Sequence, residues 1–125
     1  MDGEAAARAW VAGWTEGWES GDAERIAALY TADAVFRSHP FREPETSADD
    51  YARRAFADEE LIECRFGEPI GDGDRAAVEY WALLSVDGDE ETLAGLAVVR
   101  FGEDGRVVEQ RDYWSMQPGR AEPNF

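Results

Sequence analysis

Near the start of the chain, tryptophan recurs at every fourth position: Trp10, Trp14 and Trp18. On an α-helix this spacing places all three indole rings along one side. Gly21 and Asp22 follow at once, and such a pair is typical of one helix ending and another beginning. The sequence therefore predicts an amphipathic helix over residues 4–19. Its aromatic side is either core or one wall of a ligand cavity, and the spacing alone fits both.

The first half of the chain continues as helices around one short strand. The capping aspartate after the first helix predicts a second, short helix that runs through Tyr30. Residues 34–36 are typical of a strand, and residues 38–44 are expected to form a loop because two prolines restrict the residues before them. A capping box at Ser47 predicts a third helix that includes Phe56.

From about residue 60 the hydrophobic pattern changes from helical to alternating, and short Gly/Asp-rich turns separate the alternating segments. Connections this short join antiparallel neighbours. The predicted strands are 61–70, 75–86, 91–101 and 106–116. Helices followed by strands predict an α+β fold, with three N-terminal helices packed on one face of a strongly curved, mainly antiparallel sheet. We expect residues 1–116 to form a single domain and residues 117–125 to form a C-terminal tail.

Charge argues against two classes of partner. The chain has 28 acidic and 12 basic residues, for a formal net charge of −16, and every basic residue is an arginine. Such a surface repels phosphate backbones and anionic lipid, so we expect neither nucleic acid nor a membrane surface as a partner. No segment approaches the roughly 20 consecutive apolar residues that span a bilayer.

Cysteine and histidine are each present only once, as Cys64 and His39. One cysteine excludes an intramolecular disulfide, and the first residues lack the pattern of a secretion signal, so a cytoplasmic protein is expected. The pair cannot assemble a standard His/Cys metal cluster, and we expect neither a metal nor a cofactor. A small buried side chain is favoured for Cys64 over a nucleophile paired with His39.

The order of these elements and three local motifs carry a family resemblance. The motifs are Trp-Glu-Ser-Gly-Asp at 18–22, Ala-Ala-Leu-Tyr-Thr-Ala-Asp-Ala-Val-Phe at 27–36 and Gly-Arg-Val-Val-Glu-Gln-Arg-Asp-Tyr-Trp at 105–114. The chain resembles the nuclear-transport-factor-2-like superfamily, and within it the SnoaL-like group of small stand-alone proteins. The resemblance implies a cone-shaped barrel, an apolar pocket between the helices and the concave sheet face, and a homodimer formed by the outer sheet face. Because one fold hosts many chemistries, it does not specify a reaction.

The ketosteroid isomerases of the same superfamily use a carboxylate base, a tyrosine donor and a protonated aspartate in an apolar pocket. The positions that match these three hold Ser38 beside His39, Trp14 and Ala97. An indole N–H donates a hydrogen bond but does not ionise like a phenol, and alanine does neither. The resemblance therefore does not extend to that isomerase mechanism.

Asp112 is the leading catalytic candidate. Alternation in the last strand places it on one face with Gln110 and Trp114, and the resemblance turns that face inward. Enclosure by aromatic rings desolvates a carboxylate and raises its pKa toward a range useful for proton transfer. The alternative is a structural acid bonded to backbone or to an arginine. The Asp-Arg-Asp arrangement of the limonene-epoxide-hydrolase branch is more remote, since Arg111 and Asp112 have no evident second pocket aspartate.

His39 is the second catalytic candidate, because its loop covers the pocket mouth in related folds and its side chain titrates near neutral pH. A surface loop histidine is the alternative. Nine aromatic residues are candidate ligand contacts: Trp14, Trp18, Tyr30, Phe36, Phe41, Tyr51, Phe56, Tyr80 and Trp114. Each alone is more often core, but together they exceed what a core of this size needs. That surplus predicts a cavity that stacks a ring-shaped, largely apolar ligand.

Several charged residues remain open. Glu79 lies in an otherwise apolar strand, and a slip of one residue exchanges its two faces. We favour the outer face, beside Trp81 and paired with an arginine across a dimer interface, over the pocket. Arg111 has the same uncertainty. Arg37 and Arg42 flank the proline-containing loop, where they either meet an anionic group of a ligand or remain solvated.

These observations favour a pocket protein that binds a small hydrophobic or aromatic metabolite. As an enzyme it would perform cofactor-free acid/base chemistry such as isomerisation, cyclisation, dehydration or hydration. A non-catalytic ligand-binding or dimerisation module is the alternative. A subunit of a larger oxygenase or transport assembly has little support in the sequence.

Overall fold

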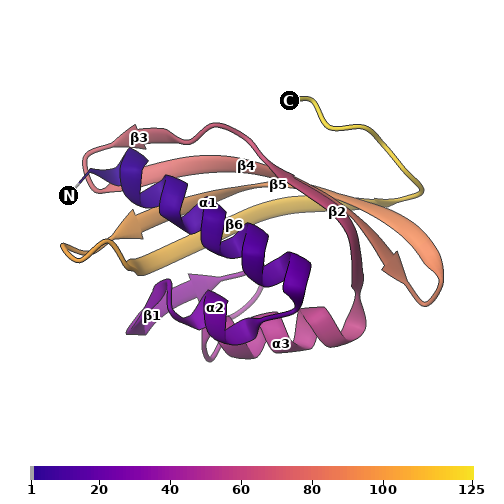
Figure 1. Ribbon diagram of the computed structural model, residues 1–125, viewed down its shortest axis with the longest axis horizontal. Coiled ribbons are helices and arrows are strands. Elements are labelled where there is room, and N and C mark those ends of the chain that lie inside the picture. Colours follow the sequence, from indigo (N-terminus) through magenta and orange to yellow (C-terminus); the bar gives the residue numbers. More distant parts are fainter. Residues whose placement is uncertain (1) are drawn as a thin grey trace.

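The computed structural model describes residues 2–125, in which three helices lie on one face of a six-stranded sheet (Figure 1). In chain order the elements are α1 (Gly3–Ser20), α2 (Ala23–Ala27), β1 (Tyr30–Arg37), α3 (Ala48–Asp58), β2 (Glu60–Phe66), β3 (Ile70–Asp72), β4 (Arg75–Val86), β5 (Asp89–Phe101) and β6 (Val107–Pro118). The predicted α+β fold, with helices packed on a curved and mainly antiparallel sheet, is confirmed. None of the helices in residues 2–125 is both long and apolar enough to cross a membrane.

The strand order is β1-β6-β5-β4-β2, with β3 also paired to β4. β1 runs parallel to β6, and every other pair is antiparallel. The long strands β4, β5 and β6 form the meander expected from the short turns. Their register places Ala97 of β5 opposite Asp112 of β6, and Tyr80 of β4 opposite Gly95 of β5.

Local signals explain both ends of α1. The Asp2 side chain accepts hydrogen bonds from the N–H groups of Glu4 and Ala5, which have no partner inside the helix. Gly21 ends the helix at φ 68°, a left-handed conformation that favours glycine. Trp10 and Trp14 are buried, and their indole N–H groups donate to Gln110 of β6 and Tyr30 of β1. The aromatic side predicted from the four-residue spacing therefore packs inward.

The second helix is shorter than predicted. α2 ends at Ala27, and Tyr30 is the first residue of β1 instead of the last of a helix. Tyr30 pairs with Val107 of β6, and its side chain is only 7% exposed. Pairing with a strand so distant in sequence outweighs local helical preference. β1 consequently spans Tyr30–Arg37 and not only residues 34–36.

The predicted strand 61–70 is also divided. β2 ends at Phe66 and β3 begins at Ile70, because Pro69 between them has no N–H to continue the ladder. The Gly67 N–H still donates to the Glu79 carbonyl at 2.8 Å, and β2 and β3 both pair with β4 in the antiparallel direction. The other three strands begin and end within two residues of the predicted bounds.

The outer sheet face is partly covered by the chain itself. Residues 119–125, yellow in Figure 1, follow β6 without forming a helix or strand. The Trp81 indole N–H donates to the Ala121 carbonyl at 2.8 Å, and the Thr92 hydroxyl donates to the Gly119 carbonyl at 2.7 Å. Glu79 is exposed on this side, next to the buried Trp81. A dimer through this face stays a prediction.

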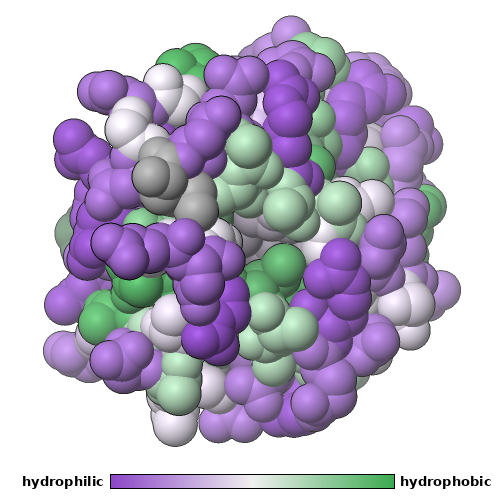
Figure 2. All heavy atoms as spheres, turned by 60° about the vertical axis from the view of Figure 1, so that its left-hand side comes forward, coloured by the Kyte–Doolittle hydropathy of each residue, from purple (hydrophilic) through white to green (hydrophobic). Residues whose placement is uncertain are grey.

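The exterior matches the composition. On the face shown in Figure 2, hydrophilic residues surround smaller hydrophobic areas. Many surface arginines pair with carboxylates nearby, for example Arg8 with Glu68 at 2.9 Å and Arg25 with Glu16 at 3.0 Å. Exposed pairs of this kind contribute little to stability, on the order of 0–1 kcal/mol each. The fold therefore depends mainly on the buried contacts between helices and sheet.

Gly95 makes room for two aromatic side chains on the concave sheet face. A Cβ at this position would lie 2.7 Å from the Trp114 Cβ, 2.8 Å from the Tyr80 Cζ and 2.8 Å from the Tyr113 carbonyl oxygen. One of these atoms belongs to the backbone of β6, so the contact cannot be relieved by a side-chain rotation alone. The missing side chain thus sets how closely Tyr80 and Trp114 approach β5.

We expect Gly95→Ala to lower the free energy of unfolding by roughly 1–3 kcal/mol, because overpacking forces backbone shifts. Without the clash, alanine in a strand would be more stabilising than glycine, by roughly 0.5–1 kcal/mol. Urea denaturation measures the sign. Gly67→Ala is the matched control, since its Cβ would meet no atom closer than 3.5 Å. A Gly95→Ala protein as stable as the native one would contradict the close approach of Tyr80 and of β6 to Gly95.

Candidate functional site

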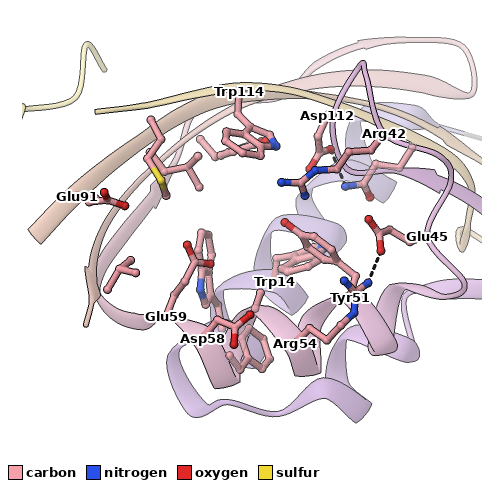
Figure 3. Close-up of a pocket in the computed structure, with 18 of the residues that line it drawn as sticks. Trp14, Arg42, Glu45, Tyr51, Arg54, Asp58, Glu59, Glu91, Asp112 and Trp114 are labelled. Carbon is pink, nitrogen blue, oxygen red and sulfur yellow. Dashed lines mark hydrogen bonds and ion pairs between the residues drawn. The ribbon is translucent and has the colours of Figure 1, made fainter. Parts of the chain in front are cut away.

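A cavity of about 580 Å³ opens between α1, α3 and the concave face of the sheet (Figure 3). This volume lies in the range of small-molecule binding sites, roughly 300–1,000 Å³. The lining residues are Trp10, Trp14, Trp18, Arg42, Glu45, Tyr51, Arg54, Ala55, Phe56, Asp58, Glu59, Phe66, Tyr80, Val86, Glu91, Leu93, Gln110, Asp112, Trp114 and Met116. Most of the inner wall is aromatic or aliphatic, and the charged side chains come mainly from α3 and the loop before it.

Six of the nine aromatic candidates line the cavity: Trp14, Trp18, Tyr51, Phe56, Tyr80 and Trp114. The rings of Trp14 and Trp18 meet edge to face, with centroids 6.4 Å apart, and Phe66 closes the same wall 6.5 Å from Trp18. Because Trp10 and Trp14 are also almost fully buried, the stripe belongs to the core and to the cavity wall at once.

The other three aromatic candidates lie elsewhere. Tyr30 and Phe36 are buried in the core, where their rings stack with centroids 6.0 Å apart, so neither is among the residues that line the cavity. Phe41 is 93% exposed because its loop turns it outward. His39 is also outside the lining; its ring packs edge-on against Trp114 at 4.8 Å, and its Nδ1 accepts the Phe41 N–H.

Asp112 occupies the cavity wall at the end of a buried hydrogen-bond network. The Trp14 indole N–H donates to the Tyr30 hydroxyl at 2.9 Å, and the Trp10 indole N–H donates to Gln110 Oε1 at 3.1 Å. The Tyr30 hydroxyl donates to the same Gln110 oxygen. The Gln110 amide nitrogen then donates to Asp112 Oδ1 at 2.9 Å. The first helix and the last strand are joined through these polar groups.

This network fixes the orientation of the Gln110 amide. Its oxygen accepts from an indole N–H and a phenol O–H, and the indole nitrogen is a donor only, so the amide –NH₂ could not take the place of the oxygen there. The amide –NH₂ must therefore point toward Asp112. Gln110 thereby holds the carboxyl group of Asp112 in place. The indole N–H groups of Trp10 and Trp14 donate within this network, so they are not available to a ligand.

Burial raises the pKa of Asp112 from 3.8 to about 7. Asp112 is only 8% exposed, so the charged form of its carboxyl group loses most of its hydration. Hydrogen bonding from the Gln110 amide and the Tyr80 hydroxyl acts in the opposite direction and is smaller. Both the acid and the carboxylate forms are consequently populated near neutral pH, which suits a group that accepts or donates protons.

Two phenols remain neutral hydrogen-bond donors in the same space. Burial raises the pKa of Tyr51 and of Tyr80, and the negative charge of Asp112 adds to both increases. In Figure 3 the Tyr51 hydroxyl points into the cavity. The wall that contains Asp112 thus offers a titrating carboxyl group beside phenols that stay protonated.

The charged residues at the opening are divided between two sides (Figure 3). Asp58, Glu59 and Glu91 lie on one side, and burial followed by the charges of Asp58 and Glu91 raises the pKa of Glu59. On the other side Arg54 pairs with Glu45. Arg42 also lies there, with its guanidinium carbon 5.2 Å from the centre of the Trp114 ring.

Sequence reasoning did not identify most of the lining from α3 and β5. The signals were present: Ala55 and Asp58 follow the predicted contact Tyr51 at helical spacing, and Glu91 and Leu93 alternate with outward-facing residues. Charges at such positions are usually solvated, so they were not assigned to a site. Gln110 shared the predicted inward face with Asp112, but only the long-range contacts show its role.

Within residues 2–125, no three side chains of histidine, cysteine, aspartate or glutamate come together in a geometry that could hold a metal ion. Cys64 is half-buried, and burial raises the pKa of its thiol to about 11. A thiol with a raised pKa is a poor nucleophile near neutral pH. The reactive groups of the cavity are therefore its carboxyl and hydroxyl groups.

The raised pKa of Asp112 predicts a pH-dependent effect of Asp112→Asn on stability. The folded state holds its proton up to about pH 7, whereas the unfolded chain releases it near pH 3.8, so the native protein loses stability as pH rises between these values. Asparagine does not ionise, so the variant does not lose this stability as pH rises. In urea denaturation the variant should exceed the native protein by roughly 2–4 kcal/mol at about pH 8, and the gap should shrink toward about pH 4.

Asp104→Asn is the control with the opposite sign. Hydrogen bonds from Arg106 lower the pKa of the exposed Asp104, so its contribution is present above the unfolded pKa and disappears as pH falls. That variant should lose a little stability at neutral pH and none in acid. An Asp112→Asn effect that is the same at every pH would show that burial does not raise the pKa of Asp112.

Comparison with known proteins agrees with this geometry. A search of curated proteins found no match to the chain. The family model for the SnoaL-like domain, however, matches residues 7–110, which include the tryptophan stripe, α3, β4, β5 and the start of β6 as far as Gln110. The predicted family resemblance is confirmed, and the chain belongs to the SnoaL-like family of the nuclear-transport-factor-2-like superfamily.

Proposed function

We propose that this protein binds a small, flat, hydrophobic or aromatic metabolite in its cavity, and that Asp112 catalyses a cofactor-free acid/base reaction on it. Suitable reactions are isomerisation, cyclisation, dehydration and hydration. The observation that carries the proposal is a buried carboxyl group with a pKa of about 7 in the wall of an apolar cavity. Such a combination is characteristic of catalytic acids and bases.

The shape of the cavity supports a flat ligand. Trp14, Trp18, Phe66 and Met116 contribute apolar surface to the lining, and Figure 3 shows Trp114 of β6 across the space from Trp14. Aromatic rings bury large areas and stack on planar groups, while the thioether of methionine adapts to irregular outlines. A ligand with one or two fused rings would displace water from these surfaces.

The chemistry follows from the arrangement around Asp112. As a carboxylate it would take a proton from a carbon next to a carbonyl group, and as an acid it would return that proton to another carbon or to a departing oxygen. Gln110 keeps the carboxyl group oriented during both steps. The neutral hydroxyl of Tyr80 donates to Asp112 as well, so it stabilises the carboxylate form that accepts the proton.

We expect Asp112→Asn to abolish catalysis without abolishing binding. Ligands would first be found by quenching of tryptophan fluorescence with a panel of fused-ring ketones and phenols, and turnover would be followed by liquid chromatography. The variant should lose at least about 10²-fold in kcat, since acid/base groups contribute roughly 10²–10⁴-fold, with a Kd within about threefold of native.

Glu91→Gln is the matched control, because it removes another carboxylate of the cavity, located at its opening. It should leave kcat within a few fold. Equal turnover by the native and Asp112→Asn proteins would remove Asp112 as the catalyst. Tight binding of several compounds with no turnover of any would instead support the non-catalytic binding module, with Asp112 serving only the hydrogen-bond network.

A further inference from the structure

We propose that the cavity selects ligands that carry a single anionic oxygen group, such as a carboxylate, and that Arg42 binds this group. The proposal rests on the proposed binding function and adds the chemical class of the ligand. It also assigns an orientation: the anionic end lies between Arg42 and Tyr51, and the flat hydrophobic body extends along the tryptophan wall.

Arg42 forms no direct ion pair within residues 2–125. In the part of the chain that the structure describes, no carboxylate lies within 4.0 Å of its guanidinium, although the protein has a large excess of acidic residues. Arg54, the other arginine of the lining, pairs with Glu45. The cavity therefore holds one neutralised arginine and one that is free to meet a ligand.

The loop that carries Arg42 is held in place. The Trp114 indole N–H donates to the Ser38 carbonyl at 2.5 Å, and the Glu45 N–H donates to the Phe36 carbonyl at 2.8 Å. The Arg42 guanidinium lies over the Trp114 ring and makes one weak hydrogen bond, to the Ser38 hydroxyl at 3.4 Å. Aromatic stacking thus positions the group while most of its five N–H donors remain available.

Figure 3 shows the Arg42 guanidinium and the Tyr51 hydroxyl directed into the same part of the cavity. The Tyr51 hydroxyl forms no hydrogen bond within residues 2–125, and it stays protonated because burial raises its pKa. A guanidinium fork and a phenol O–H together match the two oxygens of a carboxylate. A neutral amide would gain less from these donors, because hydrogen bonds between two charged groups are stronger.

The opposite side of the opening limits the number of negative charges. Asp58, Glu59 and Glu91 have no ion-pair partner in the described residues, so they repel a second anionic group. They also oppose the reversed orientation of a monoanion. The lining as a whole therefore favours one negative charge, located at Arg42.

The test compares three probes of the same shape: 2-naphthoate, 2-naphthamide and 2-naphthylmethylammonium. Binding would be measured by calorimetry at about pH 6, where Asp112 is largely protonated and does not repel the anion. About 0.15 M salt screens the acidic surface beyond about 8 Å. We expect the native protein to bind naphthoate about tenfold more tightly than naphthamide, as charge-assisted hydrogen bonds predict.

Arg42→Gln should remove this preference by weakening naphthoate about tenfold, with naphthamide changed less than about twofold. Arg37→Gln is the matched control, since Arg37 also lacks a carboxylate within 4.0 Å in the described chain but does not line the cavity. It removes the same charge and should leave the preference intact. Arg42→Lys retains the positive charge but not the planar guanidinium group, so this variant should keep part of the preference for naphthoate over naphthamide.

Several results would overturn the proposal: naphthamide or the ammonium probe binding best to the native protein, a preference that survives Arg42→Gln, or equal losses in the Arg37 and Arg42 variants. In each of these cases bound naphthamide would still support the hydrophobic cavity. Failure of all three probes, together with the fused-ring panel, would remove both the anion site and the proposed binding function.

Discussion

The buried hydrogen bonds from Trp10 and Trp14 through Tyr30 and Gln110 to Asp112 are the constraint on which the rest of this structure depends. They satisfy polar groups that would otherwise destabilise the interior. They also fix how α1 lies on the sheet, because both indole N–H groups donate to acceptors on the strands, the Tyr30 hydroxyl of β1 and the Gln110 oxygen of β6. A hydrophobic stripe alone tolerates rotation and sliding, whereas these directional contacts do not.

The same network accounts for the cavity. Since the N–H edges of Trp10 and Trp14 are bound to the sheet, other parts of their rings contribute to the cavity wall, and the less buried Trp18 adds to that surface. Gly95 leaves space for Tyr80 and Trp114 on the facing wall. Asp112 is then enclosed, and no arginine of residues 2–125 forms an ion pair with it, so burial disfavours its charged form and lowers stability near neutral pH. Such a cost is expected at functional sites.

Much of the fold could be predicted from sequence, and the candidate site only partly. Helical spacing, capping residues and short turns located α1, α3, β4, β5 and β6. Alternation grouped Asp112 with Gln110 and Trp114, and the family resemblance predicted that this face points inward. The end of α2 was misplaced, because Tyr30 pairs with Val107 and not with its own helix. His39 and Phe41 were expected at the pocket, but the loop turns Phe41 to solvent and leaves His39 outside the lining.

The sequence by itself determined the elements that depend on neighbours a few residues away, since a cap, a helical face or a strand face needs only local hydrogen bonds and a period of 3.6 or 2. Tertiary structure alone decided which polar groups meet. Trp10 and Gln110 are 100 residues apart, and Arg42 reaches the ring of Trp114 from a loop. Their meeting depends on strand register and loop packing, where a shift of one residue exchanges buried and exposed side chains.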